Sequence, residues 1–101
     1  MINELIPKLD MCTKLINELQ FNAEALQVLY KLDSTFVSLC SLAKDIPLCH
    51  YEHTLLHIVA KLMGWGIAYT HKGFQQESAI CWKMSEQLYA DPLCKYISVI
   101  H

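Results

Sequence analysis

Apolar residues recur at intervals of three and four along almost the whole chain, which is the spacing that brings side chains to one face of an α-helix. The first apolar stripe comprises Ile2, Leu5, Leu9, Cys12, Ile16 and Leu19, and the second comprises Ala25, Leu29, Leu32, Phe36, Leu39 and Ala43. Both predict amphipathic helices, the second over residues 23–44. Because the second stripe keeps its phase across Asp33, Ser34 and Thr35, we expect one unbroken helix with Asp33 and Ser34 facing solvent.

Residues that begin or end helices divide the pattern. Gln20, Phe21 and Asn22 form a short connection in which Asn22 can cap the second helix. The Asp45-Ile46-Pro47 run closes that helix and opens a third, since Asp is a good cap and Pro is tolerated in a first turn. Gly73 suits the left-handed residue that ends a helix. The third helix is therefore expected to end there.

The rest of the chain continues the same periodicity. The third stripe comprises Leu48, Tyr51, Leu55, Ile58, Leu62, Trp65 and Tyr69. A fourth helix, over residues 74–89, carries on one side Ser78, Cys81, Trp82, Ser85, Leu88 and Tyr89. A fifth helix after Asp91-Pro92 carries Leu93, Tyr96, Ile97 and Ile100. We expect a single all-α domain of antiparallel hairpins with about five helices, divided into residues 1–45, 47–90 and 92–101.

Length and composition narrow the possible functions. A domain of 101 residues has little room for a core together with a deep catalytic cleft, and 53% hydrophobic residues is more than a lone small domain buries. The eight cationic residues are all Lys and are scattered, and the net charge is −2, which argues against nucleic-acid binding. No signal peptide or membrane-spanning segment is expected, and the predicted location is cytoplasmic.

The five cysteines are odd in number and show no Cys-x-x-Cys spacing, so they suggest neither a disulfide framework nor a zinc site. We interpret them as reduced thiols that serve as small core residues. No cofactor is expected.

Three histidines form the sharpest local cluster. On a helix, His50, His53 and His57 lie away from the apolar stripe, and His53 with His57 has the i, i+4 spacing that can chelate zinc. The glutamate of the His-Glu-x-x-His pattern is missing, because Glu52 precedes His53. An exposed histidine face is the favoured interpretation, metal binding remains an alternative, and no catalytic constellation is evident.

Part of the second hairpin resembles a tetratricopeptide repeat. Gly66, Tyr69 and Gly73 have the spacing with which that family brings two antiparallel helices together and turns between them. In its second helix the family places a large aromatic residue between two small ones, a pattern met here by Ser78, Trp82 and Ser85. The resemblance covers about a third of the chain and makes residues 47–90 a tetratricopeptide-like hairpin.

The resemblance implies a function in binding another protein. Small proteins in which an irregular hairpin precedes such a repeat look like the chaperones of bacterial type III secretion. In the repeat family the ligand lies along the first helix of the hairpin, which implies the contact positions Ala60, Met63, Ile67, Thr70 and His71. The expectation is a non-enzymatic module that holds a helical or hydrophobic segment of a partner. A self-associating structural protein and a small metal-binding protein remain the alternatives.

Overall fold

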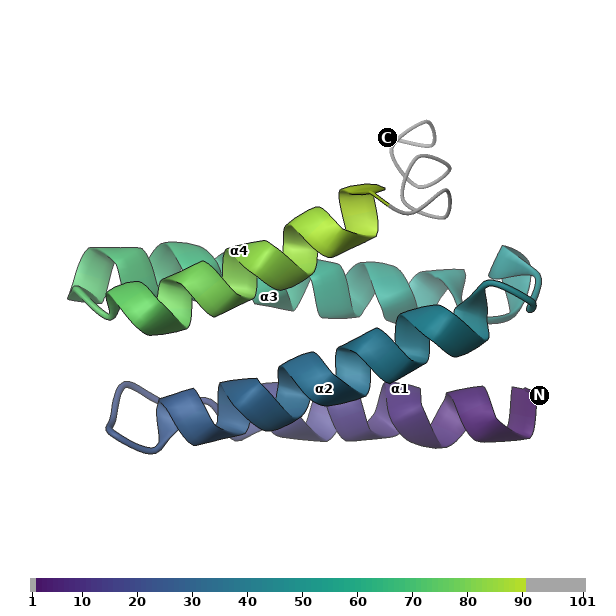
Figure 1. Cartoon of the computed structure of the whole chain (residues 1–101), viewed down its shortest axis with the longest axis horizontal. Coiled ribbons are helices and arrows are strands. Elements are labelled where there is room, and N and C mark those ends of the chain that lie inside the picture. Colours follow the sequence, from purple (N-terminus) through teal and green to yellow (C-terminus); the bar gives the residue numbers. More distant parts are fainter. Residues whose placement is uncertain (1, 91–101) are drawn as a thin grey trace.

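A computed structural model describes residues 2–90, which form four α-helices arranged as two antiparallel hairpins (Figure 1). The helices are α1 (Ile2–Asn17), α2 (Ala25–Ala43), α3 (Glu52–Lys72) and α4 (Gln75–Ala90), and a 3-10 turn, η1 (Leu48–His50), precedes α3. The all-helical prediction is confirmed for this part of the chain. The predicted fifth helix, at 92–101, lies outside the described residues.

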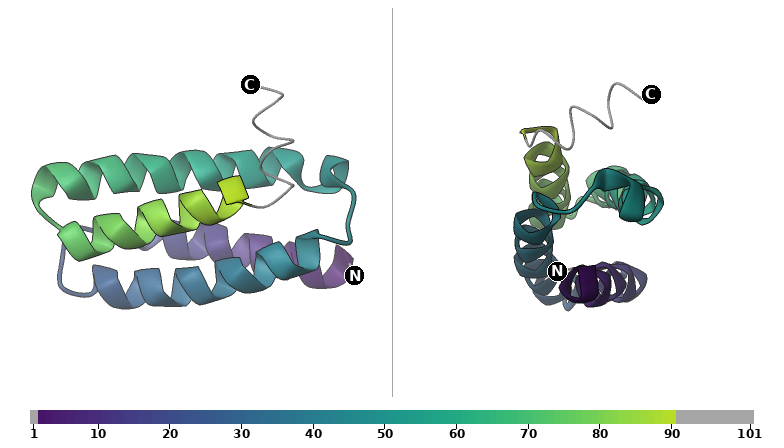
Figure 2. Two further views of the ribbon diagram at one scale, coloured as in Figure 1. Left: turned by 45° about the horizontal axis from the view of Figure 1, so that its top comes forward. Right: turned by 90° about the vertical axis from the view of Figure 1, so that its right-hand side faces the viewer.

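The two hairpins stack in the same orientation. In Figure 1, α1 and α3 run in one direction while α2 and α4 run in the other. Contacts join α1 with α2 and α3 with α4 inside the hairpins, and α1 with α3 and α2 with α4 between them. Seen end on, the helices follow a C, with α2 and α4 along its back and α1 and α3 at its two ends (Figure 2).

The core is built from the predicted apolar stripes. Leu29, Leu32, Phe36 and Leu39 of α2 are almost completely buried, and so are Leu5 and Cys12 of α1 and Ile58 and Leu62 of α3. Three core residues lie outside the predicted stripes, Leu15, Ile46 and Met84. Trp65 was expected in the core but is only half-buried, because it stands at the edge of α3 beside Phe21.

The second helix is continuous, as predicted, and passes through Asp33, Ser34 and Thr35 without a break. The predicted cap was wrong, because the N-cap residue is Glu24 and the helix begins at Ala25, two residues later than expected. Asn22 instead accepts the Glu24 N–H through Oδ1 at 3.1 Å, in the turn before the helix. Asp33 was wrongly placed on the solvent face. Its side chain is largely covered between α2 and α4, where Oδ2 accepts a hydrogen bond from Lys83 Nζ at 3.2 Å.

The third helix begins later than Pro47. Tyr51, with φ −144° and ψ 3°, separates η1 from α3. Its hydroxyl donates to the Ala43 carbonyl at 3.0 Å, which fixes the connection between the hairpins. The end of α3 agrees with the prediction, since Gly73 has φ 83° and the Phe74 N–H donates to the Tyr69 carbonyl at 2.9 Å.

The helices of the second hairpin approach closely at Gly66. A Cβ atom there would lie 3.0 Å from Trp82 Cε2. The Gly66 carbonyl accepts hydrogen bonds from the hydroxyls of Thr70, at 2.8 Å, and Ser78, at 3.1 Å. Ser78 is buried at this contact, and Ser85 is buried two turns further along α4, where its hydroxyl donates to the Cys81 carbonyl at 3.1 Å. Small residues therefore stand where the two backbones come together.

Candidate binding groove

The connection between α1 and α2 packs against the second hairpin. The Phe21 ring lies 5.4 Å from that of Trp65, 5.4 Å from that of Tyr69 and 6.0 Å from that of Phe74. The Tyr69 hydroxyl donates to the Gln20 carbonyl at 2.8 Å. This aromatic cluster fixes Phe21 and Trp65 relative to each other, although residues 44 positions apart carry them.

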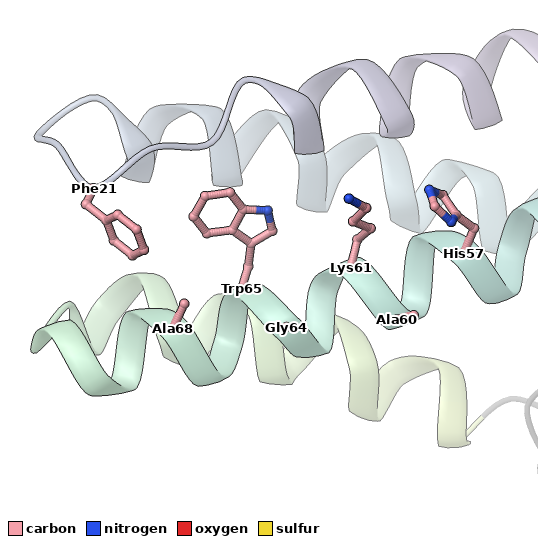
Figure 3. A pocket seen from close by; sticks show the side chains of 7 residues that line it. All are labelled: Phe21, His57, Ala60, Lys61, Gly64, Trp65 and Ala68. Carbon is pink, nitrogen blue, oxygen red and sulfur yellow. The ribbon is translucent and has the colours of Figure 1, made fainter.

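The Phe21 and Trp65 rings form one end of a groove along α3 (Figure 3). The groove has a volume of about 490 Å³, and its lining residues are Phe21, His57, Ala60, Lys61, Gly64, Trp65 and Ala68. In Figure 3 the side chains of Trp65, Lys61 and His57 point from α3 toward the first hairpin, and Phe21 points back toward α3. We call this feature the α3 groove.

The α3 groove has two chemically different halves. Around Phe21 and Trp65 it is aromatic, and Ala60, Gly64 and Ala68, four residues apart, give it a shallow floor without long side chains. Gly64 is exposed, and a Cβ atom built on it would meet no atom within 4 Å. At the other end stand the imidazole of His57 and the ammonium of Lys61, both exposed.

The predicted partner-contacting residues do not all reach this groove. Of the five, only Ala60 lines it. Ile67 is 50% exposed and Met63 is half-buried, and His71 is exposed near the end of α3. Thr70 uses its hydroxyl inside the hairpin, where it bonds the Gly66 carbonyl and Ser78. These four positions remain predicted contacts on other turns or faces of α3.

Sequence reasoning missed two residues that shape the groove. Phe21 was assigned to a connection, and Trp65 was assigned to the core. The sequence did contain a sign of the groove in the spacing of Ala60, Gly64 and Ala68. Three small residues at intervals of four lie on one helix face, which long side chains then do not cover. A second sign was Phe21, a large aromatic residue in a short connection.

The three histidines are exposed, as predicted, but they do not share one helix. His50 belongs to the 3-10 turn, and the irregular backbone of Tyr51 separates it from His53 and His57 on α3. Within residues 2–90, no three His, Cys, Asp or Glu side chains gather closely enough to hold a metal ion. The set His50, His53 and His57 is therefore not assembled as a three-ligand site.

The cysteines differ in their surroundings. Cys12 and Cys81 are buried, and desolvation raises the pKa of each thiol to about 12. Cys40 is half-buried. Cys49 was wrongly assigned to the core, because it lies exposed in the 3-10 turn. Cys94 lies outside the described residues.

A second apolar surface lies on the first hairpin. Met11 of α1 is 44% exposed, and Tyr30 and Val37 of α2 are 58% and 44% exposed. They line two shallow grooves between α1 and α2, Met11 with Tyr30 in one and Val37 in the other. Lys14, Glu18 and Lys31 stand among these residues, so both charge signs are represented.

None of the helices within residues 2–90 combines the length and the apolar character needed to cross a membrane. Comparison of the chain with protein-family models, with curated proteins and with solved structures finds no match.

Proposed function

We propose that this chain is a non-enzymatic protein-binding module that holds a helical segment of a partner in the α3 groove. The observation that carries the proposal is the groove itself, in which two aromatic rings are fixed beside an exposed floor of small residues. Exposed apolar groups gathered in a groove beside polar side chains are a common feature of interaction sites. Aromatic side chains also contribute a large share of binding energy at protein interfaces.

The dimensions of the groove suit a helix. From His57 to Ala68 the rise of about 1.5 Å per residue gives a length of about 16 Å, or three helical turns. A docked helix would place its apolar side chains over Ala60, Gly64 and Ala68, which carry no long side chains of their own, beside Trp65 and Lys61. The recognition mode is an amphipathic helix lying in a groove.

A chaperone role in the cytoplasm, of the kind found in type III secretion, extends this proposal and rests on the tetratricopeptide resemblance. Its supports are the close helix approach at Gly66, the left-handed stop at Gly73 and the buried Ser78 and Ser85. A chaperone of this type shields an apolar helix of its client until the client assembles. Such a client helix would lie in the α3 groove, along the face of α3 that carries Ala60, Gly64 and Ala68.

Site-specific photocrosslinking in the native host tests the binding site. A photoreactive amino acid at Ala60, which is exposed in the groove, should yield a discrete crosslinked species. The same amino acid at Ala79, exposed on α4 and outside the α3 groove and the grooves of the first hairpin, serves as the matched control and should not yield it. Equal crosslinking from both positions, or none from Ala60, would contradict the proposal.

Self-association is a second candidate, favoured by the exposed Met11, Tyr30 and Val37 on the first hairpin. A copy packed on this face would cover apolar surface that the monomer leaves in water. Light scattering during size-exclusion chromatography distinguishes the two functions. A dimer that Tyr30→Asp converts to monomer would support self-association through this face, and a monomeric wild-type chain would exclude it.

A further inference from the structure

The cationic end of the α3 groove has no counterion within the described residues. His57 and Lys61 line it, and no acidic side chain is among its lining residues. The ion pair found within residues 2–90 joins Lys83 to Asp33, away from this groove. A segment bound in the groove can therefore contact the Lys61 ammonium and the His57 imidazole, neither of which is in an ion pair within the described residues.

The position of this charge relative to the aromatic end is fixed by α3. Lys61 precedes Ala68 by seven residues, which corresponds to about 10 Å along the helix, or two turns. A ligand helix whose apolar anchor lies at Phe21 and Trp65 would pass His57 and Lys61 one to two turns away from that anchor. An acidic side chain at that place would lie near the Lys61 ammonium and the His57 imidazole.

The chain's own C-terminal segment fits the charge of the α3 groove less well than an acidic partner helix would. Residues 91–101 contain one acidic residue, Asp91, which follows α4 directly, and they contain Lys95 and His101 further along. Beyond Asp91, this segment has no acidic side chain that could pair with Lys61.

We infer that the α3 groove selects an amphipathic helix that carries Asp or Glu four to seven residues from its large apolar anchor, with Lys61 as the pairing residue. This inference rests on the proposed function and specifies the chemistry of its partner. The aromatic end supplies most of the affinity, because exposed ion pairs contribute little. The Lys61 contact supplies selectivity, since charge complementarity discriminates among partners that share an apolar stripe.

Selection from a displayed peptide library tests the inference on the full chain. The library consists of helical peptides with a fixed apolar stripe and randomised positions beside it. We expect enrichment of Asp or Glu at four to seven residues from the anchor. Changing that acid to its amide in a selected peptide should weaken binding about two- to fivefold, the range expected for an exposed charge pair.

Lys61→Glu should reverse the selection toward Lys and Arg at the same positions. Lys44→Glu is the matched control, because Lys44 is exposed at the end of α2, outside the α3 groove and the two grooves of the first hairpin, and the change in net charge is identical. Circular dichroism verifies that both variants remain helical. If no helix is enriched, the proposed function fails. If apolar helices are enriched without a positional acid, or Lys61→Glu retains the acid, the function stands and the inference is wrong.

Discussion

Two glycines on α3 occupy opposite environments, although both lie inside the same helix. A Cβ atom on Gly64 would point into open space, whereas one on Gly66 would lie 3.0 Å from the Trp82 ring. Glycine in a helix interior costs about 0.5–1 kcal/mol relative to alanine, so its presence at both positions calls for a reason. Close packing against α4 explains Gly66. The open α3 groove is the reason we assign to Gly64.

This contrast gives a paired prediction for the free energy of unfolding. Gly64→Ala should stabilise the chain by about 0.5–1 kcal/mol, since it gains helix propensity without a clash. Gly66→Ala should destabilise it by about 1 kcal/mol, because Trp82 must move and overpacking outweighs the propensity gain. Urea denaturation measures both. Equal effects of the two substitutions would show that Gly66 is not a contact point between α3 and α4.

The exposed and the buried thiols should differ in their reactivity. At pH 8, exposed Cys49 should react with a thiol reagent within the native state, while Cys12 and Cys81 should react only after unfolding. Burial raises the pKa of both buried thiols from 9.0 to about 12, so the unfolded chain loses these protons first as the pH rises. Stability should therefore be complete below about pH 9 and fall between about pH 9 and 12. Rapid native labelling of Cys12 or Cys81, or unchanged stability at pH 10.5, would contradict this.

The three exposed histidines should contribute little to stability. Replacing His50, His53 and His57 together by Gln should change the free energy of unfolding by less than about 1 kcal/mol, as for other surface positions. Thermal or urea melts measure the effect. A larger loss, or zinc retained stoichiometrically by wild-type chain after dialysis against a chelator, would revive the metal-binding alternative.

The helices depend on contacts that are distant in sequence as well as on their own stripes. The Tyr69 hydroxyl of α3 donates to the Gln20 carbonyl in the α1–α2 connection, 49 residues away. The Tyr51 hydroxyl donates to the Ala43 carbonyl and so joins the start of α3 to the end of α2. Two tyrosine hydroxyls thus fix the connections at both ends of the hairpins.

Removing one of these bonds should have a measurable cost. Tyr69→Phe keeps the ring in the aromatic cluster and leaves the Gln20 carbonyl without its donor, so we expect a loss of about 1 kcal/mol. Tyr30→Phe, at an exposed position on α2, is the matched control and should be neutral. Denaturant melts compare the two, and equal stabilities would show that the hydroxyl of Tyr69 does not fasten the connection.

Local periodicity was sufficient to predict the helices and most of the core. Apart from Trp65, those stripe residues of α1, α2 and α3 whose side chains are described are buried as expected, and Gly73 ends α3 where its conformational freedom indicated. The start of α3 was wrong, because the bond of Tyr51 to Ala43 cannot be read from hydrophobic spacing. Asp33 was misplaced for the same reason, since its partner Lys83 belongs to another hairpin.

At the scale of the whole molecule, stacking of the two hairpins produces the groove that neither hairpin forms alone. Phe21 comes from the first hairpin's connection, and the remaining lining residues come from α3. Sequence reasoning placed partner contacts along α3 but could not place Phe21 opposite Trp65, because that contact depends on how the hairpins stack. Only Ala60 was predicted to contact a partner and also lines the groove.

The central claim is that the α3 groove holds a partner helix, and filling the groove without harming the fold tests it most directly. Gly64→Leu places a large side chain on the exposed floor, where no atom lies within 4 Å of the added Cβ, so the chain should remain folded and at least as stable. Gly64→Ala is the matched control. The measurement is the affinity of each variant for a helix selected on the wild-type chain. We predict that Gly64→Ala retains binding while Gly64→Leu loses it at least tenfold with an undiminished melting temperature. Wild-type affinity in folded Gly64→Leu would show that the partner helix does not lie in this groove.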